Sequence, residues 1–104
     1  MDYFTVGKLE DFEPGEVQAF LLKGRDIAVV KVGDAFYAFD NCCTHEGVSF
    51  SSGVGLMTEN SVTCMLHGST FSTGTGEVLG GPALDPLSIY DVQVRGNDVQ
   101  IGVG

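Results

Sequence analysis

Short segments rich in Val, Ile, Phe and Tyr recur along this chain, and Gly, Asp or Asn separates one from the next. Helical periodicity is hard to find, whereas short apolar runs between turn residues are typical of an all-β domain. We predict strands at residues 3–6, 17–22, 27–32, 35–40, 61–64, 77–79, 88–94 and 99–103. Turns that can close antiparallel hairpins are expected at residues 23–26, 33–34 and 96–98. The predicted fold is a small antiparallel β-sandwich or barrel, connected mostly as a meander.

The length of 104 residues allows one domain, spanning residues 1–104, and a hydrophobic content of 43% is sufficient for a core. Residues 41–60 and 67–76 show no alternation and are rich in Ser, Thr and Gly, so we predict loops there. A third loop, which contains two prolines, is expected at residues 80–86. An antiparallel sheet can bring all three loops to one end of the domain.

The chain is strongly acidic, with 5 Lys and Arg against 14 Asp and Glu and a net charge of −9. This charge repels nucleic acids and anionic lipid surfaces, so we expect neither as a partner and expect any protein partner to present a basic face. No apolar run approaches the roughly 18 residues of a membrane span, and the acidic N-terminus does not resemble a signal peptide. We therefore predict a soluble, cytoplasmic protein.

The only two histidines both follow a cysteine closely, in Cys43-Thr44-His45 and in Cys64-Met65-Leu66-His67, with 18 residues between the pairs. Three cysteines, two of them adjacent, do not make a disulfide framework in a reducing compartment, so metal or redox chemistry is the better interpretation. Two thiolates and two imidazoles suit either a tetrahedral zinc ion or a Rieske [2Fe-2S] cluster. The spacing favours two loops that grip an elongated cluster.

Cys42 leaves the choice of ligand open, because Cys42-x-x-His45 would mirror Cys64-x-x-His67 and would suit a symmetric zinc site. Adjacent residues at the end of a strand point to opposite sides, so only one of Cys42 and Cys43 can face a metal. We predict Cys43 as the ligand and Cys42 as a packed thiol.

The pairs Cys43-x-His45 and Cys64-x-x-His67-Gly68 resemble the ligand motif of the Rieske proteins. Residues 34–40, 71–76 and 81–87 are similar to the same family, and in size the chain resembles the Rieske ferredoxins of multicomponent aromatic-ring dioxygenases. The resemblance implies a Rieske-type antiparallel β fold with one [2Fe-2S] cluster at one tip. It further implies loops at about 41–60 and 64–76, a proline loop at about 80–86, and the ligands Cys43, His45, Cys64 and His67.

Three further residues are candidates for contact with the cluster. Gly68 has no side chain and lets backbone N–H groups approach the sulfur atoms. The resemblance implies that Ser69 supplies a hydrogen bond to the cluster and that Pro82 keeps water away from one face of it. The resemblance also implies a low redox potential. High-potential members of the family carry a disulfide at the positions of Val48 and Leu66 and a tyrosine at the position of Phe71, and this chain has neither.

The resemblance implies a one-electron carrier that accepts electrons from a flavin-containing reductase and passes them to the Rieske centre of a terminal oxygenase. A Rieske oxygenase in its own right would need two more histidines and a carboxylate for a mononuclear iron, and no histidine remains, so the chain is not expected to be an enzyme. The alternatives are a Rieske-like small subunit of another redox complex, of the nitrite reductase type, and a Cys2His2 zinc structural module. We expect a monomer.

Overall fold

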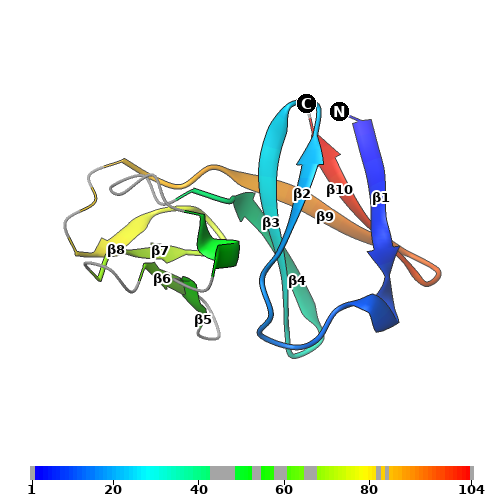
Figure 1. Ribbon diagram of the computed structural model, residues 1–104, viewed down its shortest axis with the longest axis horizontal. Coiled ribbons are helices and arrows are strands. Elements are labelled where there is room, and N and C mark those ends of the chain that lie inside the picture. The colour runs from blue at the N-terminus through cyan, green and yellow to red at the C-terminus, as the bar shows by residue number, and fades with distance from the viewer. Residues whose placement is uncertain are drawn as a thin grey trace.

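A computed structural model describes residues 2–42, 49–52, 55–57, 61–64, 68–81, 83 and 85–103 of the chain. Most of these residues belong to ten strands (Figure 1). The strands are β1 Asp2–Lys8, β2 Gln18–Leu22, β3 Arg25–Val32, β4 Ala35–Asp40, β5 Gly55–Met57, β6 Ser61–Cys64, β7 Thr70–Ser72, β8 Val78–Gly80, β9 Ile89–Arg95 and β10 Asp98–Val103. Two short 3-10 helices complete the elements, η1 at Leu9–Asp11 and η2 at Phe50–Ser52.

The strands form two sheets whose strand pairs are antiparallel, which confirms the predicted fold class. The larger sheet has the order β1-β10-β9-β4-β3-β2 and curls into a nearly closed barrel, and the smaller has the order β5-β6-β7-β8. A salt bridge of 2.5 Å between Lys23 Nζ, in the β2–β3 turn, and Asp2, at the start of β1, links the two edges of the barrel. The predicted turns at residues 23–26, 33–34 and 96–98 join β2 to β3, β3 to β4 and β9 to β10.

The small sheet is an insertion in the barrel. The chain leaves the barrel after β4 and returns at β9, and these two strands pair directly through Ala38 opposite Tyr90 and Phe39 opposite Ile89. Figure 1 shows the small sheet on one side of the barrel, whereas both chain ends lie on the barrel. None of the helices formed by the described residues has the length and apolar character needed to cross a membrane.

Strands β5 and β7 lie inside segments 41–60 and 67–76, which the sequence predicts to be loops, and there the prediction is wrong. Each strand has only three residues, too few for an alternation of apolar and polar side chains to be recognised. Both are held by pairing with β6, since Leu56 lies opposite Thr63 and Phe71 lies opposite Val62. The segments between the strands of the small sheet are therefore shorter than expected.

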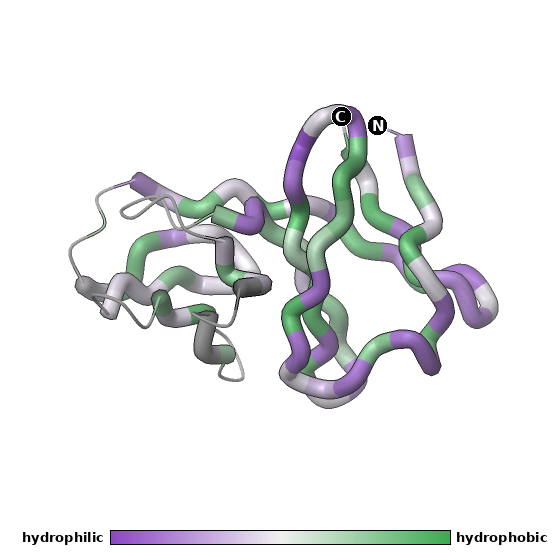
Figure 2. Tube along the Cα trace, viewed as in Figure 1, coloured by the Kyte–Doolittle hydropathy of each residue, from purple (hydrophilic) through white to green (hydrophobic). Residues whose placement is uncertain are grey.

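Apolar and polar residues alternate along the barrel strands (Figure 2), and β3 is buried on both of its faces. Its side chains divide between two cores: Ile27 and Val29 face the barrel interior, whereas Ala28 and Val30 face the small sheet. The second core also contains residues of the small sheet and of the segments that flank it, namely Phe50, Val62, Cys64, Phe71, Ala83 and Leu87. Strand β3 therefore joins the barrel to the inserted sheet through a continuous apolar contact.

Candidate functional site

Cys64 is the last residue of β6, and its side chain is completely buried in the core between barrel and inserted sheet. The chain turns back directly after it into β7. The Cys64 N–H donates to the Ser69 carbonyl at 2.8 Å, and the Gly68 N–H donates to the Cys64 carbonyl at 2.9 Å. These two bonds close the base of the turn and hold the Cys64 backbone in place.

Gly68 has a φ of +80°, a left-handed conformation that L side chains rarely adopt. A Cβ added at Gly68 would meet no atom within 4 Å among the described residues outside its chain neighbours. The need for glycine in this turn therefore follows from the backbone angle. The interpretation that Gly68 brings backbone N–H groups close to sulfur stays a prediction.

The proline loop lies directly on this turn. Ser69 is 1% exposed, and its Oγ accepts a hydrogen bond of 3.2 Å from the Ala83 N–H. Gly81 approaches so closely that an added Cβ would lie 2.5 Å from the Gly68 oxygen and 2.5 Å from the Ser69 Cα. The sequence predicts the proline loop but not the closeness of this contact. Such a contact leaves no room for water between the two segments at Gly81.

The first predicted loop begins where β4 ends and is fastened to the barrel by aromatic rings. Phe50, at the start of η2, lies edge-on to Phe39 of β4 with ring centroids 5.6 Å apart, and edge-on to Phe71 of β7 at 6.3 Å. All three rings are at most 1% exposed. This row of rings joins the barrel, η2 and the small sheet.

A hydrogen bond also joins β9 to the end of β4. The Tyr90 hydroxyl donates to the Asp40 carboxylate, and the Asp40 N–H donates to the Ser88 carbonyl at 2.9 Å. Partial burial, followed by the hydrogen bond to Asp40, raises the pKa of Tyr90 above its usual value. Tyr90 therefore stays a protonated donor at neutral pH and keeps the two strands together where the insertion leaves the barrel.

Of the predicted site residues, the structure brings together Cys64, Gly68 and Ser69. Cys43, His45, His67 and Pro82 lie outside the described residues. Within the described part of the chain, no three His, Cys, Asp or Glu side chains form a group that could hold a metal ion.

The prediction of a packed thiol at Cys42 is wrong, because that residue is exposed. Asn41, the preceding residue, is 3% exposed. The alternation of the strand end therefore turns Asn41 inward and Cys42 outward.

The described part of the site fits an iron–sulfur cluster. Cys64 is a soft sulfur donor, it is buried, and it stands at the start of a tight turn that the proline loop covers. A thiolate that is shielded from water on the protein side and held by a rigid backbone is suited to ligate iron.

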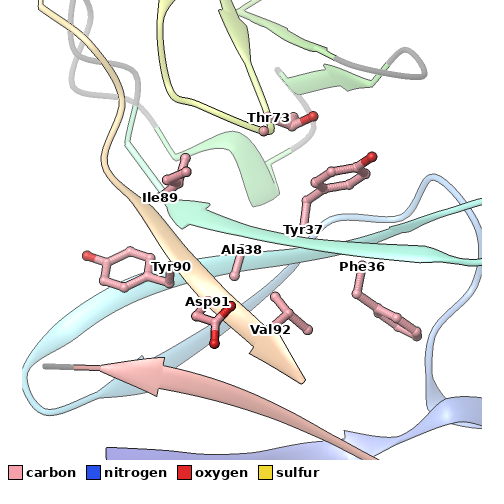
Figure 3. Close-up of a pocket in the computed structure, with 9 residues that line it drawn as sticks. Phe36, Tyr37, Ala38, Thr73, Ile89, Tyr90, Asp91 and Val92 are labelled. Carbon is pink, nitrogen blue, oxygen red and sulfur yellow. The ribbon is translucent and has the colours of Figure 1, made fainter. Parts of the chain in front are cut away.

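A crevice of about 390 Å³ lies between the barrel and the β7–β8 turn, and Cys64 is not among the residues that line it. Figure 3 shows Thr73 of that turn on one side of the crevice and Tyr37 and Ile89 of the barrel on the other. The crevice follows from the way the small sheet leans on the barrel.

The Thr73 hydroxyl is buried and has no hydrogen-bond partner in the described part of the protein. Replacing Thr73 with valine keeps the shape of the side chain and removes the unsatisfied group, so we expect stability to stay the same or to rise by about 1 kcal/mol. Thermal unfolding of the two proteins in parallel measures this. Thr63→Val is the matched control, because the Thr63 hydroxyl is bonded to Thr70 Oγ1 at 3.0 Å and its loss should destabilise. A larger loss for Thr73→Val than for Thr63→Val would contradict the prediction.

The fold and the site define a small antiparallel β protein. A second sheet is inserted in its barrel, and strand β6 of that sheet ends at a buried cysteine, Cys64. The sequence profile described as the Rieske [2Fe-2S] domain matches residues 2–91. The chain belongs to this family, and its cofactor is a Rieske-type [2Fe-2S] cluster. This result confirms the resemblance seen in the sequence and decides between zinc and an iron–sulfur cluster in favour of the cluster.

Individual relatives in sequence and in structure are ferredoxins of dioxygenase systems. The chain is 44% identical over 75 residues, 72% of its length and 70% of the relative's, to the 3-phenylpropionate/cinnamic acid dioxygenase ferredoxin subunit of Shigella flexneri serotype 5b. Among solved structures it is similar to the ferredoxin of carbazole 1,9a-dioxygenase from Nocardioides aromaticivorans IC177, with a TM-score of 0.88, 29% identity and 97% of both chains covered. It is also similar to a chain in a complex of reduced oxygenase and oxidized ferredoxin of carbazole 1,9a-dioxygenase, with a TM-score of 0.85, 31% identity, and 95% and 91% of the chains covered.

Proposed function

We propose that this protein carries single electrons from a flavin-containing ferredoxin reductase to the Rieske centre of a terminal aromatic-ring dioxygenase. The observation that carries the proposal is the 44% identity to a dioxygenase ferredoxin subunit. The similarity to a chain from an oxygenase–ferredoxin complex supports the same role. The protein is the electron-transfer component of such a system and not its enzyme.

The ligands in this proposal are Cys43 and Cys64 on one iron and His45 and His67 on the other. Two observations support this set of ligands. The two histidines of the chain each follow a cysteine closely, and Cys64 is buried at the start of a turn. When bound, the cluster takes up and releases one electron. The chain contributes a rigid turn at Gly68 and Ser69 and a proline loop around Pro82 that limits access of water to the site.

The proposal also covers the oligomeric state, the cellular compartment and the partners of the protein. Residues 1–104 act as one Rieske domain, as a monomer in the cytoplasm, and the net charge of −9 favours partners with basic docking faces. Nucleic acids and membranes are not among the partners, because the same charge repels them.

The test begins with absorption and electron paramagnetic resonance spectra of the purified protein before and after dithionite. We expect a red-brown protein that bleaches on reduction and gives a rhombic Rieske signal. Mixing with a flavin-containing reductase, NADH and a terminal oxygenase should then give turnover that stops when the protein is left out. A Rieske signal without transfer to any such oxygenase would contradict the proposed role, and a colourless protein holding zinc would contradict the proposed ligand set as well.

The redox potential should lie below zero, toward the low end of the Rieske range of about −150 to +300 mV. Phe71 has no hydroxyl to donate to the cluster, and the positions of the disulfide cysteines are occupied by Val48 and Leu66. Reduction adds negative charge, which the acidic surface opposes. A spectroelectrochemical titration at neutral pH measures the potential, and a midpoint well above zero would contradict this prediction.

A further inference from the structure

The Asn41 side chain joins the two ends of segment 42–50, which is the part of the first predicted loop that precedes Ser51. Asn41 directly follows β4, and Ser51 lies ten residues further along in η2. Asn41 Nδ2 donates to Ser51 Oγ at 2.8 Å, and Asn41 Oδ1 accepts from the Ser51 N–H at 2.9 Å. One amide therefore spans the stem of the segment 42–50.

The same amide is tied to the barrel through Asp26 of β3. The Asn41 N–H donates to the Asp26 carbonyl at 3.0 Å and continues the β3–β4 ladder by one residue. Nδ2 also lies 3.3 and 3.4 Å from the two Asp26 carboxylate oxygens. The two ends of segment 42–50 are thus fixed to each other and to a strand of the barrel.

The chemistry of this position requires an amide. One group must accept from a backbone N–H and also donate to a hydroxyl and a carboxylate, which only an amide of this size can do. Aspartate would lose the bond donated to Asp26 and would place a second carboxylate beside it, and its contact with Ser51 Oγ would survive only if the hydroxyl turned to donate. Asn41 is 3% exposed, so the lost bonds would not be fully replaced by water.

We propose that Asn41 is a positioning residue for the cluster: it holds the stem of the first loop closed, so that the loop presents Cys43 and His45 at a fixed separation from the second loop. This inference rests on the proposed function, because Cys43 and His45 are ligands only in that proposal. Ligands carried on a loop must be held to within about 0.5 Å, and the groups that hold them determine how tightly metal is retained.

The fold should survive loss of the amide, because a separate apolar contact also fastens this end of the loop. Phe50, the residue before Ser51, is 1% exposed and lies between Phe39 and Phe71. Removal of the Asn41 side chain should therefore loosen the stem without unfolding the domain.

The experiment compares the cluster-loaded wild type with Asn41→Ala, Asn41→Asp, Ser51→Ala and Asn97→Ala. Asn97 is the matched control, because it is an exposed asparagine in the β9–β10 turn, far along the chain from the ligand pairs. Three quantities are measured: release of the cluster to an iron chelator, the g values and line widths of the reduced protein, and hydrogen exchange of the Ser51 amide.

We expect both Asn41 variants to release the cluster about tenfold faster or more, with broadened resonance lines, since partners behind metal ligands commonly have effects of this size. Ser51→Ala removes only the Oγ acceptor and should have a smaller effect, and Asn97→Ala should match the wild type. Exchange of the Ser51 amide should rise in Asn41→Ala.

Faster Ser51 exchange with an unchanged spectrum and release rate would overturn the inference, because Asn41 would then stabilise a turn and nothing more. If Asn41→Ala does not fold, Ser51→Ala takes its place, and a release rate equal to wild type would overturn the inference. A wild type without a Rieske spectrum would overturn the proposed function and this inference together, whereas an intact wild-type spectrum with unaffected variants overturns this inference alone.

Discussion

Replacing Cys64 with serine should abolish the [2Fe-2S] cluster. Serine is a poor ligand for iron in such a cluster, and two backbone hydrogen bonds, to Ser69 and from Gly68, hold the Cys64 backbone in place. We expect iron and labile sulfide to fall below about a tenth of the wild-type content, together with the visible absorption and the resonance signal. Chemical analysis of both elements in the purified variant measures the loss.

Cys42→Ser is the matched control for that change, because it makes the same atomic replacement at an exposed position. We expect it to keep full colour, whereas Cys43→Ser should lose the cluster as Cys64→Ser does. Loss of the cluster in Cys42→Ser with retention in Cys43→Ser would show that the first ligand lies one residue earlier. A coloured Cys64→Ser protein would remove Cys64 from the ligand set.

The barrel could be predicted from the sequence because its strands are long enough to show their pattern. Strand β3 carries Ile27 to Val30 in an unbroken buried run between turn residues, and its hairpins with β2 and β4 close at short Gly-containing turns. Such information is local. The division of the run between two cores is not local, because it depends on the inserted sheet packing against one face of β3.

The inserted sheet was only partly predictable. Phe71 stands between two polar residues in a three-residue strand, a pattern that does not differ from that of a loop. Its strand character comes from pairing with β6, and the contact between β4 and β9 joins residues about fifty positions apart. Pairings of this kind are settled by tertiary packing and leave no periodic signal.

The candidate site shows the same division. The Cys and His pairs could be recognised because their spacing is written in the sequence, and the family assignment confirms the cofactor that they imply. Asn41 could not be recognised, because an asparagine at the end of a strand is an ordinary turn residue until Ser51 and Asp26 are placed beside it. The sequence predicts the chemistry of this site better than the contacts that position it.

Replacing Gly81 with alanine should destabilise the protein strongly. Gly81 has a φ of +84°, where alanine costs roughly 1–2 kcal/mol. The added Cβ would also lie 2.5 Å from the Gly68 oxygen and 2.7 Å from the Ser69 nitrogen, and backbone atoms cannot move aside as a flexible side chain can. Together these effects should reach about 3 kcal/mol or more, which lowers the melting temperature of a domain this size by about 12 °C or more.

Gly80→Ala is the matched control. It tests whether the loss in Gly81→Ala comes from the contact with Gly68 and Ser69 or from a general intolerance of alanine in this segment. Gly80 is the neighbouring residue, and an added Cβ there meets no atom within 4 Å among the described residues outside its chain neighbours. Its melting temperature should stay close to that of the wild type, and equal losses in both variants would contradict the assigned contact. The alanine at 81 can be accommodated only if the proline loop lifts from Gly68 and Ser69. Because that movement lets water reach the turn that follows Cys64, Gly81→Ala should also release the cluster to a chelator faster at temperatures where the variant is still folded.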